Sequence, residues 1–166
     1  INTILDNYRY NTFKDLLDLG KIRFAEEEVY TMPKQITLLN KMIGIAKGLY
    51  KEEEKVNDFE SKVISAISNE DNVYFWHRNQ ERGKGFFING FINHYPDFIV
   101  KLKSGQTLLI ETKGDDRDNS DSARKLELGT AWANKAGSQY RYYMVFDKKA
   151  MDGAITIKDL LGKIEQ

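Results

Sequence analysis

The sequence contains no cysteine and only two histidines, His77 and His94. Without cysteine the chain can form neither a disulfide framework nor the common cysteine-ligated zinc modules. Two histidines are also too few for a histidine-rich metal site. These absences exclude the disulfide-rich secreted domains, and they fit a cytoplasmic protein.

Long apolar runs are missing as well. No stretch approaches the ~20 residues required to span a bilayer, and no basic segment followed by an apolar one resembles a signal peptide. The hydrophobic content of 41% is nevertheless typical of a folded chain, and 166 residues suffice for one domain with a real core. Because the sequence starts at Ile1 and stops abruptly after Gln166, we expect it to be part of a larger protein.

The net charge is zero, with 25 basic and 25 acidic residues that balance in each third of the chain. No segment is therefore a basic arm for nucleic acid. If the protein binds DNA or RNA, its positive surface must be created by folding or supplied by a neighbour.

Hydrophobic periodicity predicts an α/β domain in which helices cover both faces of a mixed sheet. The first 55 residues have helical spacing, in 10–20 and again in 32–54, and the acidic runs 26–28 and 52–54 are expected to be solvated. Beyond them the pattern predicts helices at 57–72, 118–135 and 156–164, and strands at 72–79, 83–90, 95–102, 106–113 and 139–146.

Three charged residues interrupt the apolar hairpin 95–113. They are Asp97, just after Pro96, and the pair Glu111 and Lys113, which share one strand face because they are two residues apart. Charges are expensive in such a position unless they are paired or used.

The register of this hairpin decides whether the three charges meet. Packing Phe98, Val100 and Leu102 in one layer with Leu108 and Ile110 requires a loop of odd length. We expect the loop Ser104–Gly105–Gln106, which pairs Lys103 with Thr107 and Asp97 with Lys113. The three charged side chains then share one face.

Two readings of this cluster remain open from spacing alone. Two carboxylates can hold a hard divalent cation, which polarises a phosphodiester and lowers the pKa of a bound water, while a lysine orients that water or neutralises the phosphate. The alternative is a structural salt bridge on a solvated strand face.

The ordered segments "NVYFWHRN", "YPDFIV" and "LLIETKG" resemble the PD-(D/E)xK nuclease superfamily, with Pro96-Asp97 and Glu111-Thr112-Lys113 in its signature positions. More narrowly, residues 56–146 are similar to the C-terminal endonuclease region of type III restriction subunits and helicase-fused nucleases. The resemblance implies a restriction-endonuclease-like core of about four strands in a nuclease domain over 56–166, preceded by a helical segment over 1–55.

The resemblance also implies a Mg²⁺-dependent endodeoxyribonuclease, in which Mn²⁺ is expected to substitute. Asp97 and Glu111 would bind the metal together with the carbonyl of Thr112, and Lys113 would position or activate the attacking water. Glu60, on the helix before the sheet, would complete the metal site or bind a second ion; an ordinary surface glutamate is the alternative.

Five basic residues are candidates for contact with DNA phosphates, with solvated surface charge as the alternative for each. Arg124 and Lys125 lie on the helix after the motif, and Arg78, Arg82 and Lys84 lie in or beside the loop before it. The carboxylates of Asp115 and Asp116 compete for the metal but are expected to be loop residues.

The sequence has no G-x-x-x-x-G-K-[ST] loop and therefore no ATPase motor of its own. By the resemblance, DNA is the substrate, and the partners are an upstream helicase or ATPase region of the parent protein and a modification subunit. Two other functions stay open: a nuclease for RNA or branched DNA, and a decayed nuclease fold that serves as a DNA-binding or docking module.

Overall fold

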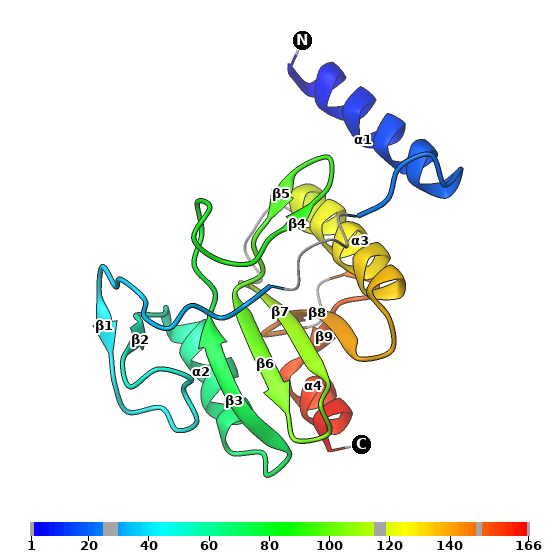
Figure 1. Cartoon of the computed structure of the whole chain (residues 1–166). Coiled ribbons are helices and arrows are strands. Elements are labelled where there is room, and N and C mark those ends of the chain that lie inside the picture. Colours follow the sequence, from blue (N-terminus) through cyan, green and yellow to red (C-terminus); the bar gives the residue numbers. More distant parts are fainter. Residues whose placement is uncertain (1, 25–29, 115–118, 149–150, 166) are drawn as a thin grey trace.

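The computed structural model describes residues 2–24, 30–114, 119–148 and 151–165. Within them are four helices and a mixed five-stranded sheet with helices on both of its faces, so the predicted α/β class is confirmed (Figure 1). The helices are α1 (Asn2–Asp18), α2 (Asp58–Ser68), α3 (Asn119–Ala136) and α4 (Ile157–Ile164). None of the helices in these residues is long and apolar enough to cross a membrane.

The central sheet has the strand order β3-β6-β7-β8-β9. Its first three strands are antiparallel, whereas β8 and β9 continue from β7 in parallel. The strands are β3 (Val73–Arg78), β6 (Phe98–Leu102), β7 (Thr107–Lys113), β8 (Tyr140–Phe146) and β9 (Ile155–Thr156). Two small hairpins pair β1 (Lys41–Met42) with β2 (Glu53–Glu54), and β4 (Ile88–Asn89) with β5 (Asn93–His94).

Each face of the sheet carries its own apolar core. On one face α2 and α4 pack against β6 and β7, and the fully buried residues there include Ile64, Phe98 and Ile110. On the other face α3 packs against β8, and its Leu128 lies in one buried cluster with Ile99 of β6 and Leu109 of β7. A strand buried on both sides needs apolar residues at successive positions, which explains the unbroken runs in β6 and β7.

The β6–β7 hairpin keeps the predicted faces but not the predicted register. Val100 lies opposite Leu108 and Lys101 opposite Thr107, and the amide of Leu102 donates to Gln106 O. The loop is therefore three residues long, as predicted, but it spans 103–105 instead of 104–106. The expected pairing of Lys103 with Thr107 is therefore wrong by two residues. The amide of Lys103 instead donates to Asn72 O, on the turn that leads into β3.

This shift by two residues preserves the side-chain alternation. Phe98 pairs with Ile110, so the apolar layer forms as predicted, and the ladder extended by one residue places Asp97 beside Glu111 rather than Lys113.

The helix predicted over 32–54 is wrong. This segment is irregular apart from β1 and β2, and Gly44 and Lys47 adopt positive φ angles that a helix cannot contain. Its supposed apolar stripe is not buried either, since Leu39 is 86% exposed. The segment instead runs along the outer edge of β3, where Trp76 N–H donates to Lys47 O. Covering the edge strand in this way satisfies backbone groups that would otherwise remain open.

Other elements follow the predictions with shifted ends. The helix predicted at 10–20 is α1, which begins at Asn2 and stands away from the sheet in Figure 1. The strand predicted at 83–90 shrinks to β4, since 83–85 continue the preceding turn and 86–87 are irregular. The acidic run 26–28 lies outside the described residues, whereas the run 52–54 is not fully solvated, because Glu53 is buried.

Close packing of α3 on β8 depends on Gly129. A Cβ atom there would lie 2.4 Å from the ring of Tyr142, whose hydroxyl contacts His94 Nε2 at 2.8 Å. Burial, with help from Lys125 and Lys113, lowers the pKa of His94 to about 3, so this buried pair is neutral.

We therefore expect Gly129→Ala to destabilise the protein by about 1–3 kcal/mol, because the clash with Tyr142 outweighs the better helix propensity of alanine. Urea unfolding followed by circular dichroism measures the change. Gly162→Ala in α4 is the matched control, since a Cβ there meets no atom within 4 Å, and it should stabilise the chain. Equal effects of the two substitutions would show that the contact with Tyr142 is not limiting.

Candidate functional site

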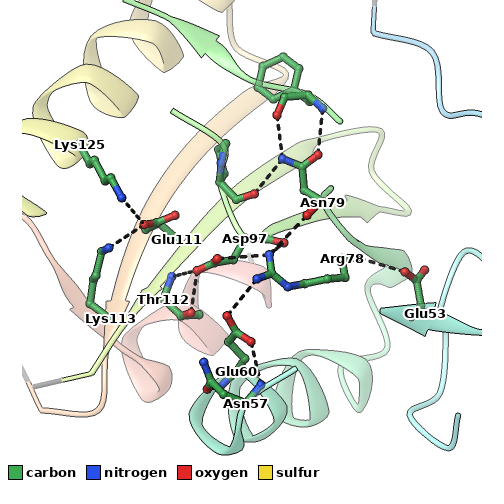
Figure 2. Close-up of polar contacts among 12 residues, drawn as sticks. Glu53, Asn57, Glu60, Arg78, Asn79, Asp97, Glu111, Thr112, Lys113 and Lys125 are labelled. Atoms are coloured by element: carbon green, nitrogen blue, oxygen red, sulfur yellow. Dashed lines mark hydrogen bonds and ion pairs between the residues drawn. The ribbon is translucent and has the colours of Figure 1, made fainter. Parts of the chain in front are cut away.

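The predicted charged residues gather where β7 ends and β6 begins (Figure 2). Asp97 immediately precedes β6, and Glu111 and Lys113 lie within the last three positions of β7. The helices on the two sheet faces add Glu60 from α2 and Lys125 from α3. Side chains from both strands of the hairpin and from both covering helices therefore surround one end of the hairpin.

Asp97 is held by donors on both of its carboxylate oxygens. Oδ2 accepts hydrogen bonds from the amide and the hydroxyl of Thr112, each at 2.7 Å. Oδ1 lies 3.2 Å from Arg78 Nη1, and the same nitrogen donates to the backbone oxygen of Asp97 at 2.8 Å. The carboxylate is thus fixed in one orientation, and Thr112 has a side-chain role that the sequence did not predict.

Glu111 is the most deeply placed acid of the group, with only 4% of its surface exposed. Its Oε1 lies 2.9 Å from Lys113 Nζ and 3.6 Å from Lys125 Nζ. Burial, reinforced by the negative charge of Asp97, raises the pKa of Glu111 to about 7 although both lysines oppose the change. The two carboxylates are therefore close enough to repel each other, and they lie side by side in Figure 2.

Lys125 connects α3 to this acidic pair. Its ammonium lies 3.3 Å from Asp121 Oδ2, one helical turn earlier, in addition to its contact with Glu111. Burial alone lowers the pKa of Lys125, but Glu111 and Asp121 outweigh that effect, so its pKa is raised overall. Lys125 therefore carries its positive charge at the end of the hairpin.

Glu60 is oriented by the start of its own helix. Its Oε2 accepts from the amide of Asn57, while its own amide donates to Asn57 Oδ1, which forms a capping box. This leaves Oε1 to accept from Arg78 Nη2 at 3.2 Å. One carboxylate thus stabilises the helix and also faces the charged cluster.

Arg78 is the central cation of the site. Its guanidinium spans Glu60 and Asp97 and lies over the ring of Phe98, 5.3 Å from the ring centre. Glu60 and Asp97 are therefore joined through a cation. The sequence suggested Arg78 only as a contact for DNA phosphates. The alternation of side chains along a strand could have predicted its actual position, because Arg78 lies two residues after the buried Trp76 and so shares the α2 face of β3.

The sequence analysis also did not predict a buried pair next to Arg78, formed by Glu53 and His77. Glu53 Oε2 lies 2.9 Å from His77 Nδ1 and accepts from the backbone amide of Arg78 at 3.2 Å. Asn79, also buried, donates to Pro96 O at 2.9 Å and so fixes the chain just before Asp97. Only the tertiary fold reveals these roles, because the partners are 17 to 25 residues apart.

The site offers carboxylate ligands for a metal ion, but the described side chains do not form a complete set of ligands. Within the described ranges, no three histidine, cysteine, aspartate or glutamate side chains converge closely enough to hold an ion. The close pair is Asp97 and Glu111, with Glu60 kept apart by Arg78. Mg²⁺ is usually bound through one or two carboxylates and retains several waters, so this pair fits that ion.

The remaining predicted residues lie elsewhere. Arg124 hydrogen-bonds Asn7 and lies over the ring of Tyr10, so it joins α3 to α1. Lys84 is exposed in the turn before β4. Asp115 and Asp116 fall outside the described residues.

Comparisons of the chain with known protein families, with curated proteins and with solved structures give no match.

The raised pKa of Glu111 makes stability depend on pH. Between pH 4.5 and about 7 the folded chain holds a proton that the unfolded chain has lost, so the free energy of unfolding falls as pH rises. We expect Glu111→Gln to remove this slope. Relative to the wild type, the variant should gain about 3 kcal/mol between pH 4.5 and pH 7.5, because each tenfold difference in proton affinity between the two states corresponds to about 1.4 kcal/mol.

Urea unfolding at several pH values measures this difference, with Asp71→Asn on an exposed turn as the control for losing a carboxylate. Parallel curves of stability against pH for the wild type and Glu111→Gln would contradict the raised pKa.

Proposed function

We propose that this chain is a Mg²⁺-dependent nuclease domain of the PD-(D/E)xK type that hydrolyses phosphodiester bonds in DNA. The observation that carries the proposal is the pair of adjacent carboxylates, Asp97 and Glu111, with Lys113 2.9 Å from Glu111. Helix α2, the antiparallel strands β3, β6 and β7, helix α3 and the parallel strand β8 support a restriction-endonuclease-like core, because they occur in the order that the resemblance implies.

The cost of burying Glu111 favours chemistry over a structural role. An acid whose pKa is raised by burial and by a second carboxylate destabilises the fold at neutral pH. A docking module gains nothing from that arrangement, whereas a metal site uses it. The decayed-fold alternative is therefore disfavoured by the same pair that supports the nuclease.

Asp97 and Glu111 would hold the ion, with the Thr112 carbonyl as a further oxygen ligand. When bound, Mg²⁺ supplies Lewis-acid polarisation of the phosphate and lowers the pKa of a bound water. Lys113, whose ammonium already lies against Glu111, would donate to the attacking water or to the phosphate. Lys125 adds a second positive charge on the α3 side, where the negative phosphate would approach.

Arg78 would compete with the metal for Asp97. Its guanidinium balances the charges of Asp97 and Glu60. A cation that binds Asp97 weakens this balance, and Glu60 can join the ion only when Arg78 moves aside. Arg78 therefore acts as an internal counter-ion, in place of the phosphate contact suggested by the sequence.

The zero net charge of the chain suits a nuclease domain whose affinity for DNA comes from another region or subunit. Counterion release drives much of DNA binding, and a chain with 25 positive and 25 negative residues gains little from it. An upstream helicase or ATPase region and a modification subunit would supply affinity and target choice. RNA or branched DNA is the alternative substrate.

The first test is plasmid cleavage with Mg²⁺ or Mn²⁺. We expect Asp97→Ala and Lys113→Ala each to reduce the rate by roughly 10² or more, the usual contribution of such groups. Lys103→Ala, an exposed lysine on the same hairpin, is the matched control and should cleave like the wild type. Cleavage that survives both site substitutions would refute the assignment, and equal rates on RNA would redirect it to the alternative substrate.

The second test is calorimetric binding of Mn²⁺. Asp97→Asn should abolish binding, whereas Arg78→Gln should tighten it by roughly ten-fold, which corresponds to losing one charge-assisted competitor of about 1.4 kcal/mol. Binding of the wild type should strengthen as pH rises through about 7, because Glu111 must release its proton. Arg82→Gln, in the exposed loop, is the control. Unchanged affinity in Arg78→Gln would show that the guanidinium does not compete.

A further inference from the structure

A cavity of about 650 Å³ lies on the α3 side of the central sheet, apart from the charged cluster. Its floor is formed by residues of three neighbouring strands, among them Phe75, Ile99 and Leu109. Trp132 of α3 and Tyr140 of β8 form one wall. This volume is within the usual range for sites that bind small organic molecules, roughly 300–1,000 Å³.

Aromatic side chains dominate the lining. Trp132 packs edge-to-face against Phe86 on one side and Tyr140 on the other, with ring centres 5.4 and 5.6 Å apart. Phe75 also lines the cavity, yet it belongs to neither apolar core of the sheet. Its ring is thus available to a ligand, and its removal leaves both cores intact.

The cavity also carries positive charge. Lys101 and Lys135 both line it, and within the described part of the chain neither is paired with a carboxylate. The ammonium of Lys101 donates to Gly105 O at 2.6 Å and to Thr107 Oγ1 at 3.1 Å, both neutral acceptors. A flat ring system bearing an anionic group therefore fits the chemistry of this cavity better than a neutral ligand.

The position of the cavity relates it to the acidic pair. Ile99 and Lys101 follow Asp97 on the same face of the chain at intervals of two residues, so they lie roughly 7 and 13 Å farther along at the usual rise of a strand. Leu109 and Thr107 stand in the same relation to Glu111. The cavity and the charged site therefore lie toward opposite ends of the same two strands, separated by the apolar core in which Ile99 and Leu109 are buried.

We propose that this cavity binds one nucleotide of a single-stranded DNA segment, with the base against the aromatic rings and the phosphate at Lys101. The inference rests on the proposed nuclease function, which brings a DNA strand to the charged end of the same two strands. Aromatic rings bind unpaired bases of any sequence, and such stacking gives affinity to a chain without a net positive charge. A free nucleotide has the same chemistry, and the test separates the two.

The test is fluorescence anisotropy of a labelled eight-nucleotide oligothymidine with the full chain in EDTA, where cleavage plays no part. Phe75→Leu should weaken binding by roughly five-fold or more, the loss expected for one stacked base. Lys101→Gln should weaken it too and reduce the salt dependence by about 0.7 in slope, the contribution of one phosphate contact in a single strand.

Each substitution has a matched control. Tyr8→Leu removes an exposed aromatic ring on α1, which contributes no residue to the cavity lining, and Lys103→Gln removes a charge two residues from Lys101; both should bind within two-fold of the wild type. An octamer without bases should bind more weakly than the oligothymidine, and thymidine monophosphate should compete only weakly.

The proposal is overturned if the oligothymidine does not bind, or if the octamer without bases binds equally well. It is also overturned if each control variant weakens binding as much as the substitution that it controls for. Competition by the monophosphate at the affinity of the octamer would also overturn it, in favour of a free-nucleotide site. These outcomes do not depend on the nuclease. A chain that binds as expected but never cleaves plasmid refutes only the proposed function, and a chain that cleaves while Phe75→Leu binds normally refutes only the cavity.

Discussion

The pairing of β6 with β7 is the constraint on which the other features depend. Phe98 opposite Ile110 and Val100 opposite Leu108 bury one apolar layer under α2 and α4, and this alternation leaves Asp97 and Glu111 on the opposite face. Both carboxylates then meet at the end of the hairpin. Any register of the other parity would separate them and would place apolar side chains in the charged cluster.

Charge balance is the second theme of the structure. Glu111 is buried with Lys113 and Lys125 beside it, and Asp97 is held by Arg78. Each acid therefore has a basic partner, but the negative charge of Glu111 is not fully compensated. The pKa of Glu111 is raised because the two lysines do not fully offset the effects of burial and of the negative charge of Asp97. A divalent cation between the two carboxylates would compensate this charge, and this is the physical basis of the proposed nuclease.

The sequence predicted the core elements because each has a strong local signal. The strands around 95–113 alternate or run apolar, and α2 begins at a capping box. The helix expected over 32–54 failed because apolar spacing does not reveal burial: Leu39 points to solvent, and the backbone at Lys47 pairs with Trp76 of the sheet edge. The hairpin register was wrong by two residues for a similar reason, since Asn72 binds the amide of Lys103 from outside the hairpin.

The sequence by itself determined which residues share a face, because side-chain alternation depends only on parity and on the apolar pattern. It therefore brought Asp97, Glu111 and Lys113 to one end of the sheet. Only the tertiary structure decided their partners: Arg78 between Asp97 and Glu60, and Lys125 beside Glu111. These contacts join separate elements, so they follow from how helices and sheet pack together, which no local pattern encodes.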